Sequence, residues 1–118
     1  MKFDEFITFL GTVDIKKTSE FYQNGLGLEL YKDQGLCKIF HISKESKLGF
    51  CSYMPVIFKG KSPILTLVVK NVDEIYHRLI NKGIEIPNPP KINSKFNIYH
   101  FFFNDPNGYT LEVQMFLD

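Results

Sequence analysis

The 118-residue sequence contains no tryptophan, only three histidines, and no surplus of charge of either sign. Fourteen Lys and Arg against thirteen Asp and Glu give a net charge of +1, which argues against a nucleic-acid surface or a polybasic membrane anchor. No apolar stretch approaches the roughly 20 residues of a membrane span, and the acidic pair in MKFDEF stands where a signal peptide would be apolar. These absences predict no nucleic-acid partner and no membrane partner.

Cysteine is also scarce, whereas aromatic residues are abundant. Cys37 and Cys51 are too few for a disulfide framework in a chain without an export signal, so we expect free thiols and a cytoplasmic protein. Twelve Phe and six Tyr predict a ring-lined interior or cavity. The length is that of a single domain, 1–118, with one core.

Two segments of the chain resemble each other, residues 13–30 and 70–86. Each is expected to form a short helix that runs into a strand beginning at a glycine. Asp14 and Asn71 stand where a helix N-cap is needed, and their side-chain oxygens can accept from the first free backbone N–H groups. The sequence therefore predicts an internal repeat.

Strand-like runs surround both predicted helices, and each half is expected to have the order βαβββ. Neither half is long enough to bury sufficient surface alone, so the halves should pair.

The Pro-rich loop 87–95 could form a semi-rigid lid. The predicted division is module 1 at about 3–54, a linker at 55–62 and module 2 at about 63–117. The predicted strands are 6–11, 27–30, 36–42, 48–53, 64–69, 83–86, 97–104 and 109–116.

The motifs VDIKKTSEFYQNGLGLEL and NDPNGYTLEVQ, together with the doubled βαβββ order, resemble the vicinal oxygen chelate superfamily. That superfamily includes glyoxalase I, extradiol dioxygenases and bleomycin-resistance proteins. The resemblance implies an α+β fold in which two paired modules form a U-shaped, partly open mixed sheet around a cavity. It also implies a homodimer.

Relatives that use a metal carry four inward ligands, typically His and Glu, on the first and last strands of each module. Counting back seven residues from each helix cap leads to Ile7 and Ile64, and isoleucine cannot bind a metal. The resemblance assigns Glu112 to the fourth position, and alignment of the two hairpins on their turns places Cys51 opposite it. We therefore expect no cofactor, with a divalent metal as the alternative.

The faces of the last hairpin follow from its turn. If DPNG closes a simple hairpin, Asn104 pairs with Tyr109, and Phe101 lies opposite Glu112. One face then carries Glu112 together with aromatic and polar side chains. His100 would point the other way, as a core histidine, unless a bulge reverses the faces. The residues expected on the Glu112 face are Tyr99, Phe101, Phe103, Thr110 and Gln114.

In the first half, strand parity places Cys37, His41 and Cys51 together, away from the helix. Two thiols and an imidazole suit a soft metal or a thiolate nucleophile, but the preferred interpretation is that both cysteines are small buried apolar residues. Cys37, His41, Cys51 and Glu112 are thus the weak candidates for metal ligands.

Two classes of function remain open. The first is a metal-free protein that holds a small apolar or aromatic ligand, as bleomycin-resistance proteins sequester a compound. The second is a glyoxalase-like lyase or isomerase, or another small-molecule enzyme, with Glu112 as catalytic base or with the Cys37/Cys51/His41 group. Glu112 could instead have only a structural role. The predicted ligand-binding residues are Phe9, Cys51, Tyr53, Tyr99, Phe101, Phe103 and Gln114.

Overall fold

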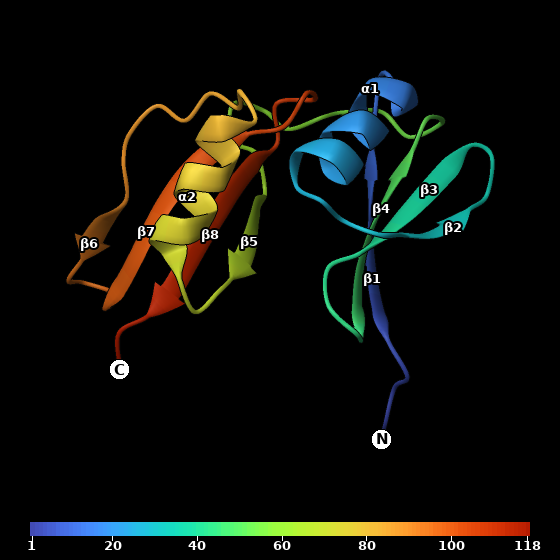
Figure 1. The fold of residues 1–118 in the computed structure, drawn as a ribbon. Coiled ribbons are helices and arrows are strands. Elements are labelled where there is room, and N and C mark those ends of the chain that lie inside the picture. Colours follow the sequence, from blue (N-terminus) through green and yellow to red (C-terminus); the bar gives the residue numbers. More distant parts are fainter. The chain divides into compact units, whose positions relative to one another are not determined.

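The computed structural model describes residues 1–118, which form two compact units, Met1–Lys59 (unit 1) and Gly60–Asp118 (unit 2). The boundary lies inside the segment 55–62 assigned to the linker. In each unit one four-stranded mixed sheet has its helix on one face (Figure 1). The α+β class and the βαβββ order of each half are confirmed.

Unit 1 has the strand order β1-β4-β3-β2, with β1 parallel to β4 and the other pairs antiparallel. Tyr22 anchors the helical segment on this sheet, with its ring centroid 4.7 Å from that of Phe50 and 6.1 Å from that of Phe40. All three rings are fully buried. The elements are β1 (Phe6–Gly11), α1 (Ile15–Glu20), a π-helical turn η1 (Phe21–Gly25), β2 (Leu30–Asp33), β3 (Cys37–His41) and β4 (Ser46–Cys51).

Unit 2 repeats this plan with the order β5-β8-β7-β6, and β5 is parallel to β8. The side of the sheet that faces α2 is apolar, with Leu111 and Val113 fully buried and Phe101 in edge contact with Tyr76 of α2. The opposite side is called the free face below. The elements are β5 (Ile64–Val68), α2 (Val72–Asn81), β6 (Lys91–Asn93), β7 (Ile98–Asn104) and β8 (Thr110–Phe116).

Both predicted helix caps are present. Asp14 Oδ1 accepts from the Lys17 N–H at 3.0 Å, and Asn71 Oδ1 accepts from the Glu74 N–H at 3.1 Å. Each cap satisfies a backbone donor that the first helical turn leaves without a partner. None of the helices is both long and apolar enough to cross a membrane.

The second strand of unit 2 is not where the sequence placed it, since residues 83–86 form no strand. Gly83 adopts φ +82°, and Gly83 and Ile84 donate backbone hydrogen bonds to the last turn of α2, so this glycine ends the helix. The strand β6 forms later, at Lys91–Asn93, after the three prolines that cannot donate to a ladder. Part of the predicted lid is therefore an edge strand.

The turn between β7 and β8 corrects the predicted faces of the last hairpin. Gly108 donates to the Asp105 carbonyl and adopts φ +92°, so a turn plus a left-handed glycine adds one residue to the loop. Asp105 Oδ1 fixes this loop by accepting from the N–H groups of Asn107 and Tyr109, at 2.8 and 2.9 Å. Asn104 pairs with Thr110 rather than Tyr109, and Phe102 rather than Phe101 lies opposite Glu112. A one-residue shift exchanges the two faces of a strand.

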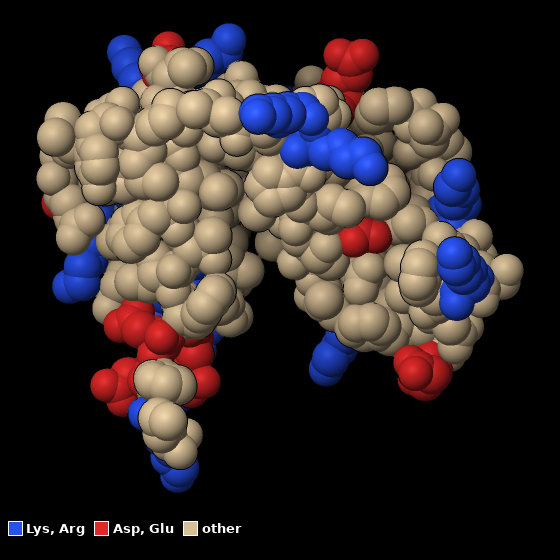
Figure 2. All heavy atoms as spheres, turned by 180° about the vertical axis from the view of Figure 1, so that it is seen from behind, with Lys and Arg blue, Asp and Glu red and all other residues tan.

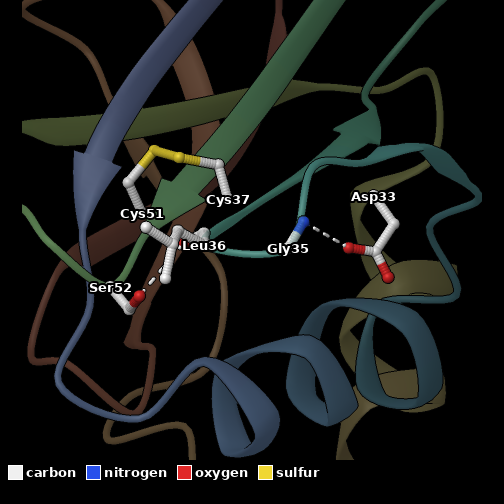
Figure 3. The surroundings of a disulfide bond; sticks show 6 residues. All are labelled: Asp33, Gly35, Leu36, Cys37, Cys51 and Ser52. Atoms are coloured by element: carbon white, nitrogen blue, oxygen red, sulfur yellow. Dashed lines mark hydrogen bonds between the residues drawn. A yellow bond between two sulfur atoms is a disulfide. The ribbon is translucent and has the colours of Figure 1, made fainter.

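The expectation of free thiols is wrong, because Cys37 and Cys51 form a disulfide (Figure 3). The two residues lie directly opposite each other on β3 and β4, with 4.1 Å between their Cα atoms. Beside the bridge, Ser52 Oγ donates to the Leu36 carbonyl at 3.2 Å, and the Gly35 N–H donates to Asp33 Oδ1 at 2.9 Å. Parity predicted the common face of the cysteines correctly, but not their bond.

Candidate functional site

The free face of unit 2 holds a buried, hydrogen-bonded pair of a histidine and a carboxylate on neighbouring strands. His100 Nδ1 lies 2.6 Å from Glu112 Oε2, and the two side chains are 6% and 9% exposed. The corrected register brings them together, because His100 pairs with Gln114 and therefore faces the same side as Glu112. The prediction that His100 points away from Glu112 is wrong.

The other groups around Glu112 are arranged to hold a carboxylate. Thr66 on β5 donates its hydroxyl to Glu112 Oε1 at 2.7 Å. Gln114 is assigned with its amide nitrogen towards Glu112, where it donates to both oxygens at 3.3 and 3.2 Å, since the opposite orientation would oppose oxygen to oxygen. With three donors directed at it, Glu112 acts as the acceptor, and the proton of this pair lies on His100 Nδ1.

The second ring nitrogen of His100 remains open. Glu112 is the hydrogen-bond partner of this ring, through Nδ1, and the neighbouring Phe102 meets its edge at 5.0 Å between centroids. No buried side-chain nitrogen or oxygen in the protein lacks a partner. Nε2 has no hydrogen-bond partner and is therefore not completely buried, so it can accept or deliver a proton on the free face.

His100 and Glu112 line a hollow of about 600 Å³, which we call the unit 2 hollow. Its walls are largely apolar, and all of its lining belongs to unit 2. The apolar lining residues are Ile64, Phe96, Ile98, Phe102 and Phe116, and the polar ones are Lys91, Asn93, His100, Glu112 and Gln114.

The equivalent face of unit 1 is filled instead of hollow. Phe9 covers Gly49, since a Cβ atom added to Gly49 would lie 2.7 Å from the Phe9 ring and 3.4 Å from Ile39. Phe9 pairs with Gly49 on the parallel strands as Thr66 pairs with Glu112. Gly49, and not Cys51 as predicted, is therefore the counterpart of Glu112.

A cluster of charged and polar side chains lies at the other end of this face of unit 1, and its members pair with one another. Lys47 Nζ lies 3.1 Å from Glu5 Oε1 and 4.8 Å from the centre of the Tyr31 ring, and the Tyr31 hydroxyl donates to Glu5 at 3.0 Å. The hydrogen bonds from Lys47 and Tyr31 lower the pKa of Glu5, and the bond to Glu5 raises the pKa of Tyr31. Acidic side chains gather near the N-terminus in Figure 2. Asp4 and Glu5 line a surface hollow. Each charge of the cluster has a partner, as in a structural ion pair.

Three of the rings predicted to face the ligand lie on the helix side of unit 2. Tyr99 donates its hydroxyl to Asp73 of α2 at 2.6 Å, and this hydrogen bond raises the pKa of Tyr99. Phe101 and Phe103 are 2% exposed and stack on each other in the core.

The prediction missed Phe102 and His100 because it took the turn for a simple hairpin. The Asp-Pro-Asn-Gly sequence carries the signal for the longer loop, since glycine readily takes the left-handed position that follows the turn.

The other predicted site residues belong to unit 1. Phe9 and Cys51 lie on its free face as expected, while Tyr53 lies exposed in the turn after β4. The disulfide leaves neither Cys37 nor Cys51 as a thiolate, so in this state they cannot act as soft ligands or nucleophiles. The remaining member, His41, contacts the Tyr31 ring at 4.8 Å between centroids.

The donor atoms do not fit the metal that the resemblance implies for other members. Ile7 and Ile64 carry no donor, Gly49 has no side chain, and Glu112 alone offers oxygen ligands at the four positions. The structure contains no group of three or more His, Cys, Asp or Glu side chains arranged to hold a metal ion. Glu112 is instead engaged by His100, Thr66 and Gln114.

Comparison with known proteins supports the assignment that the sequence suggested. The family model of the Glyoxalase/Bleomycin resistance protein/Dioxygenase superfamily matches residues 5–113. The uncharacterized protein YraH of Bacillus subtilis (strain 168) is 26% identical, over 88% of this chain and 91% of that protein.

Solved structures show the same fold. A glyoxalase/bleomycin resistance protein/dioxygenase from Nocardioides has a TM-score of 0.79 at 21% identity, covering 100% of this chain and 86% of that one. Lactoylglutathione lyase from Agrobacterium tumefaciens has a TM-score of 0.74 at 19% identity, covering 93% and 91%. The family match and the doubled βαβββ fold together show that this chain belongs to the glyoxalase/bleomycin resistance protein/dioxygenase superfamily, the vicinal oxygen chelate superfamily.

Proposed function

We propose that the protein binds a small, largely apolar or aromatic molecule in the unit 2 hollow without a catalytic metal. The observation that carries the proposal is the hollow itself, whose apolar walls surround a few convergent polar groups. This combination is typical of small-molecule sites, in which apolar area gives affinity and the polar groups fix orientation. Glu112 and Gln114 keep their predicted polar role, and Phe102 takes the place of Tyr99, Phe101 and Phe103.

The proposal is tested with the fluorescent dye 8-anilinonaphthalene-1-sulfonate, which brightens in apolar sites and meets no tryptophan background here. Phe102→Ala should weaken its binding about three- to eightfold, because the dye would cover the exposed 40% of a ring whose full burial contributes about 1.5–3 kcal/mol. Ile80→Ala is the matched control, since Ile80 of α2 is 41% exposed and Phe102 is 40% exposed. Equal affinities of the two variants would contradict binding in the hollow. A near-stoichiometric metal in the purified protein would contradict the metal-free proposal.

The second candidate is an enzyme of the glyoxalase-like kind that uses the Glu112 carboxylate. The observation in its favour is the contact of Glu112 with His100 at 2.6 Å, since a buried acid–base pair beside a cavity is an arrangement that enzymes use. Turnover of a test compound, lost on substitution of either residue, would favour this candidate over simple binding.

Two further expectations also remain proposals. A homodimer is supported by large apolar side chains that stay exposed in the single chain, among them Phe6 and Phe116 at 69% and 56%. Light scattering would measure the mass in solution, and a monomer at micromolar concentration would contradict it. The cytoplasmic location rested partly on free thiols, and the Cys37–Cys51 disulfide removes that support.

A further inference from the structure

The His100–Glu112 pair has the geometry of an oriented base. The 2.6 Å contact to Glu112 Oε2 fixes the ring and its tautomer, so the lone pair of a neutral imidazole lies on Nε2. Thr66 and Gln114 hold Glu112 in turn, which leaves this carboxylate little freedom to move. A histidine held by a carboxylate on one nitrogen can take a proton on the other, and the carboxylate stabilises the imidazolium that forms.

The surroundings of Nε2 suit a reaction that spreads negative charge over a small molecule. Lys91 of β6 pairs in register with His100, lines the same hollow and forms no salt bridge. Its ammonium group can therefore face an anion that develops on a bound molecule. The walls formed by Phe102 and Phe116 provide apolar area for an aromatic or alkyl body.

From this geometry we infer that His100 is a metal-independent general base for small aromatic or apolar compounds that carry an acidic C–H bond, with Glu112 as its positioning residue. The inference rests on the proposed function, because the compound must first occupy the unit 2 hollow. It moves the proton-accepting atom from the Glu112 carboxylate to His100 Nε2. Glu112 then holds the imidazole and balances its charge.

The probe is the base-catalysed ring opening of 5-nitrobenzisoxazole, which needs no metal, oxidant or reductant. His100 Nε2 takes the proton from C3, and the electron pair of that C–H bond completes a nitrile as the ring N–O bond breaks. The oxygen leaves as a phenolate beside Lys91, and the imidazolium passes its proton to water. The coloured 2-cyano-4-nitrophenolate product reports each turnover.

The native protein should open the ring faster than an equal concentration of free imidazole, and EDTA should not change the rate. His100→Ala should lower kcat/KM about 100-fold, within the usual contribution of a general base, and added imidazole should restore part of the rate. Glu112→Gln should lower kcat about tenfold with KM unchanged, since glutamine can still accept from Nδ1 but cannot balance its charge. His77→Ala removes an exposed imidazole on α2 and is the matched control.

The dye assay keeps the two proposals separable. If His100→Ala still binds the dye as tightly as the native protein, the variant is folded and its loss of turnover belongs to the imidazole. Dye binding in the hollow without turnover above free imidazole would overturn the base and leave the binding function standing. An unchanged rate in His100→Ala, or a rate abolished by EDTA, would also overturn it. Failure of dye binding to respond to Phe102→Ala would contradict the proposed function instead.

Discussion

Unit 1 closes the middle of its free face with a phenylalanine ring, whereas unit 2 keeps a carboxylate at the equivalent position. Gly49 and Glu112 occupy corresponding places on the last strands, and their parallel partners are Phe9 and Thr66. The next pair along each hairpin differs as strongly. Cys37 and Cys51 are joined by a disulfide where unit 2 has His100 and Gln114.

The comparison separates stability from function. An apolar contact and a covalent cross-link both stabilise a sheet, and neither requires a polar partner. A buried His–Glu pair is a weaker way to gain stability, because the desolvation of both groups offsets much of their attraction. Unit 2 nevertheless buries such a pair beneath an accessible hollow, which supports a role for His100 and Glu112 in chemistry or ligand recognition. Substitutions that make one unit more like the other, or that remove a feature only one unit has, test this difference.

The largest effect is expected when the carboxylate of unit 2 is placed in unit 1. Gly49→Glu would drive a side chain into the Phe9 ring, which lies 2.7 Å from the position of an added Cβ atom, and would bury a charge without donors. We expect the free energy of unfolding to fall by about 3–5 kcal/mol, the usual effect of an unpaired buried charge. Urea denaturation followed by circular dichroism would measure it.

Gly49→Ala is the control for the clash alone, with an expected loss of about 1–3 kcal/mol from overpacking. A loss for Gly49→Glu no greater than that for Gly49→Ala would mean that unit 1 can accommodate the carboxylate. The packing around Gly49 would then not explain why unit 1 lacks a carboxylate at this position.

The second effect concerns the cross-link that only unit 1 has. The bridged cysteines are 14 positions apart. Closing a loop of this size lowers the conformational entropy of the unfolded chain and so stabilises the fold by roughly 3 kcal/mol. The double variant Cys37→Ser/Cys51→Ser should lose about that much stability in urea, and reductant should lower the native protein to the same level.

Ser52→Ala is the matched control beside the bridge, since it removes only the exposed hydrogen bond to the Leu36 carbonyl, and it should have little effect (Figure 3). If reductant exposes both thiols to a labelling reagent without shifting the unfolding midpoint, the bridge does not stabilise unit 1.

The smallest effect comes from a helix-to-sheet bond that only unit 2 is shown to make. The hydrogen bond to Asp73 is the main cause that raises the pKa of Tyr99 above its ordinary value of 10.0. This bond stabilises the fold below pH 10, where the unfolded chain also keeps the proton, and is lost as the pH rises through the higher folded pKa.

Tyr99→Phe should therefore lose about 0.5 kcal/mol at neutral pH, and its stability should fall less steeply than that of the native protein at alkaline pH. Spectrophotometric titration should show one late-ionising tyrosine fewer in the variant. Tyr31→Phe is the control, because Tyr31 also has a raised pKa but bonds to Glu5 in unit 1. An unchanged titration curve for Tyr99→Phe would mean that the bond to Asp73 does not persist in solution.

The sequence was sufficient for the plan of both units. The repeated caps at Asp14 and Asn71 and the alternation of apolar residues along the strands predicted the βαβββ order, because these signals act within a few residues. The same alternation placed Cys37 and Cys51 on a common face correctly.

The sequence alone did not determine which residues of unit 2 meet. One additional loop residue at Gly108 moved Tyr99, Phe101 and Phe103 to the helix side and brought His100 to Glu112, because strand faces alternate with every residue. The bond between Cys37 and Cys51 depended likewise on the pairing of two strands. Local pattern thus predicted the order of the elements, although not the position of β6. The tertiary register decided the chemistry of the site, since hydrogen bonds form between side chains that only strand pairing brings within reach.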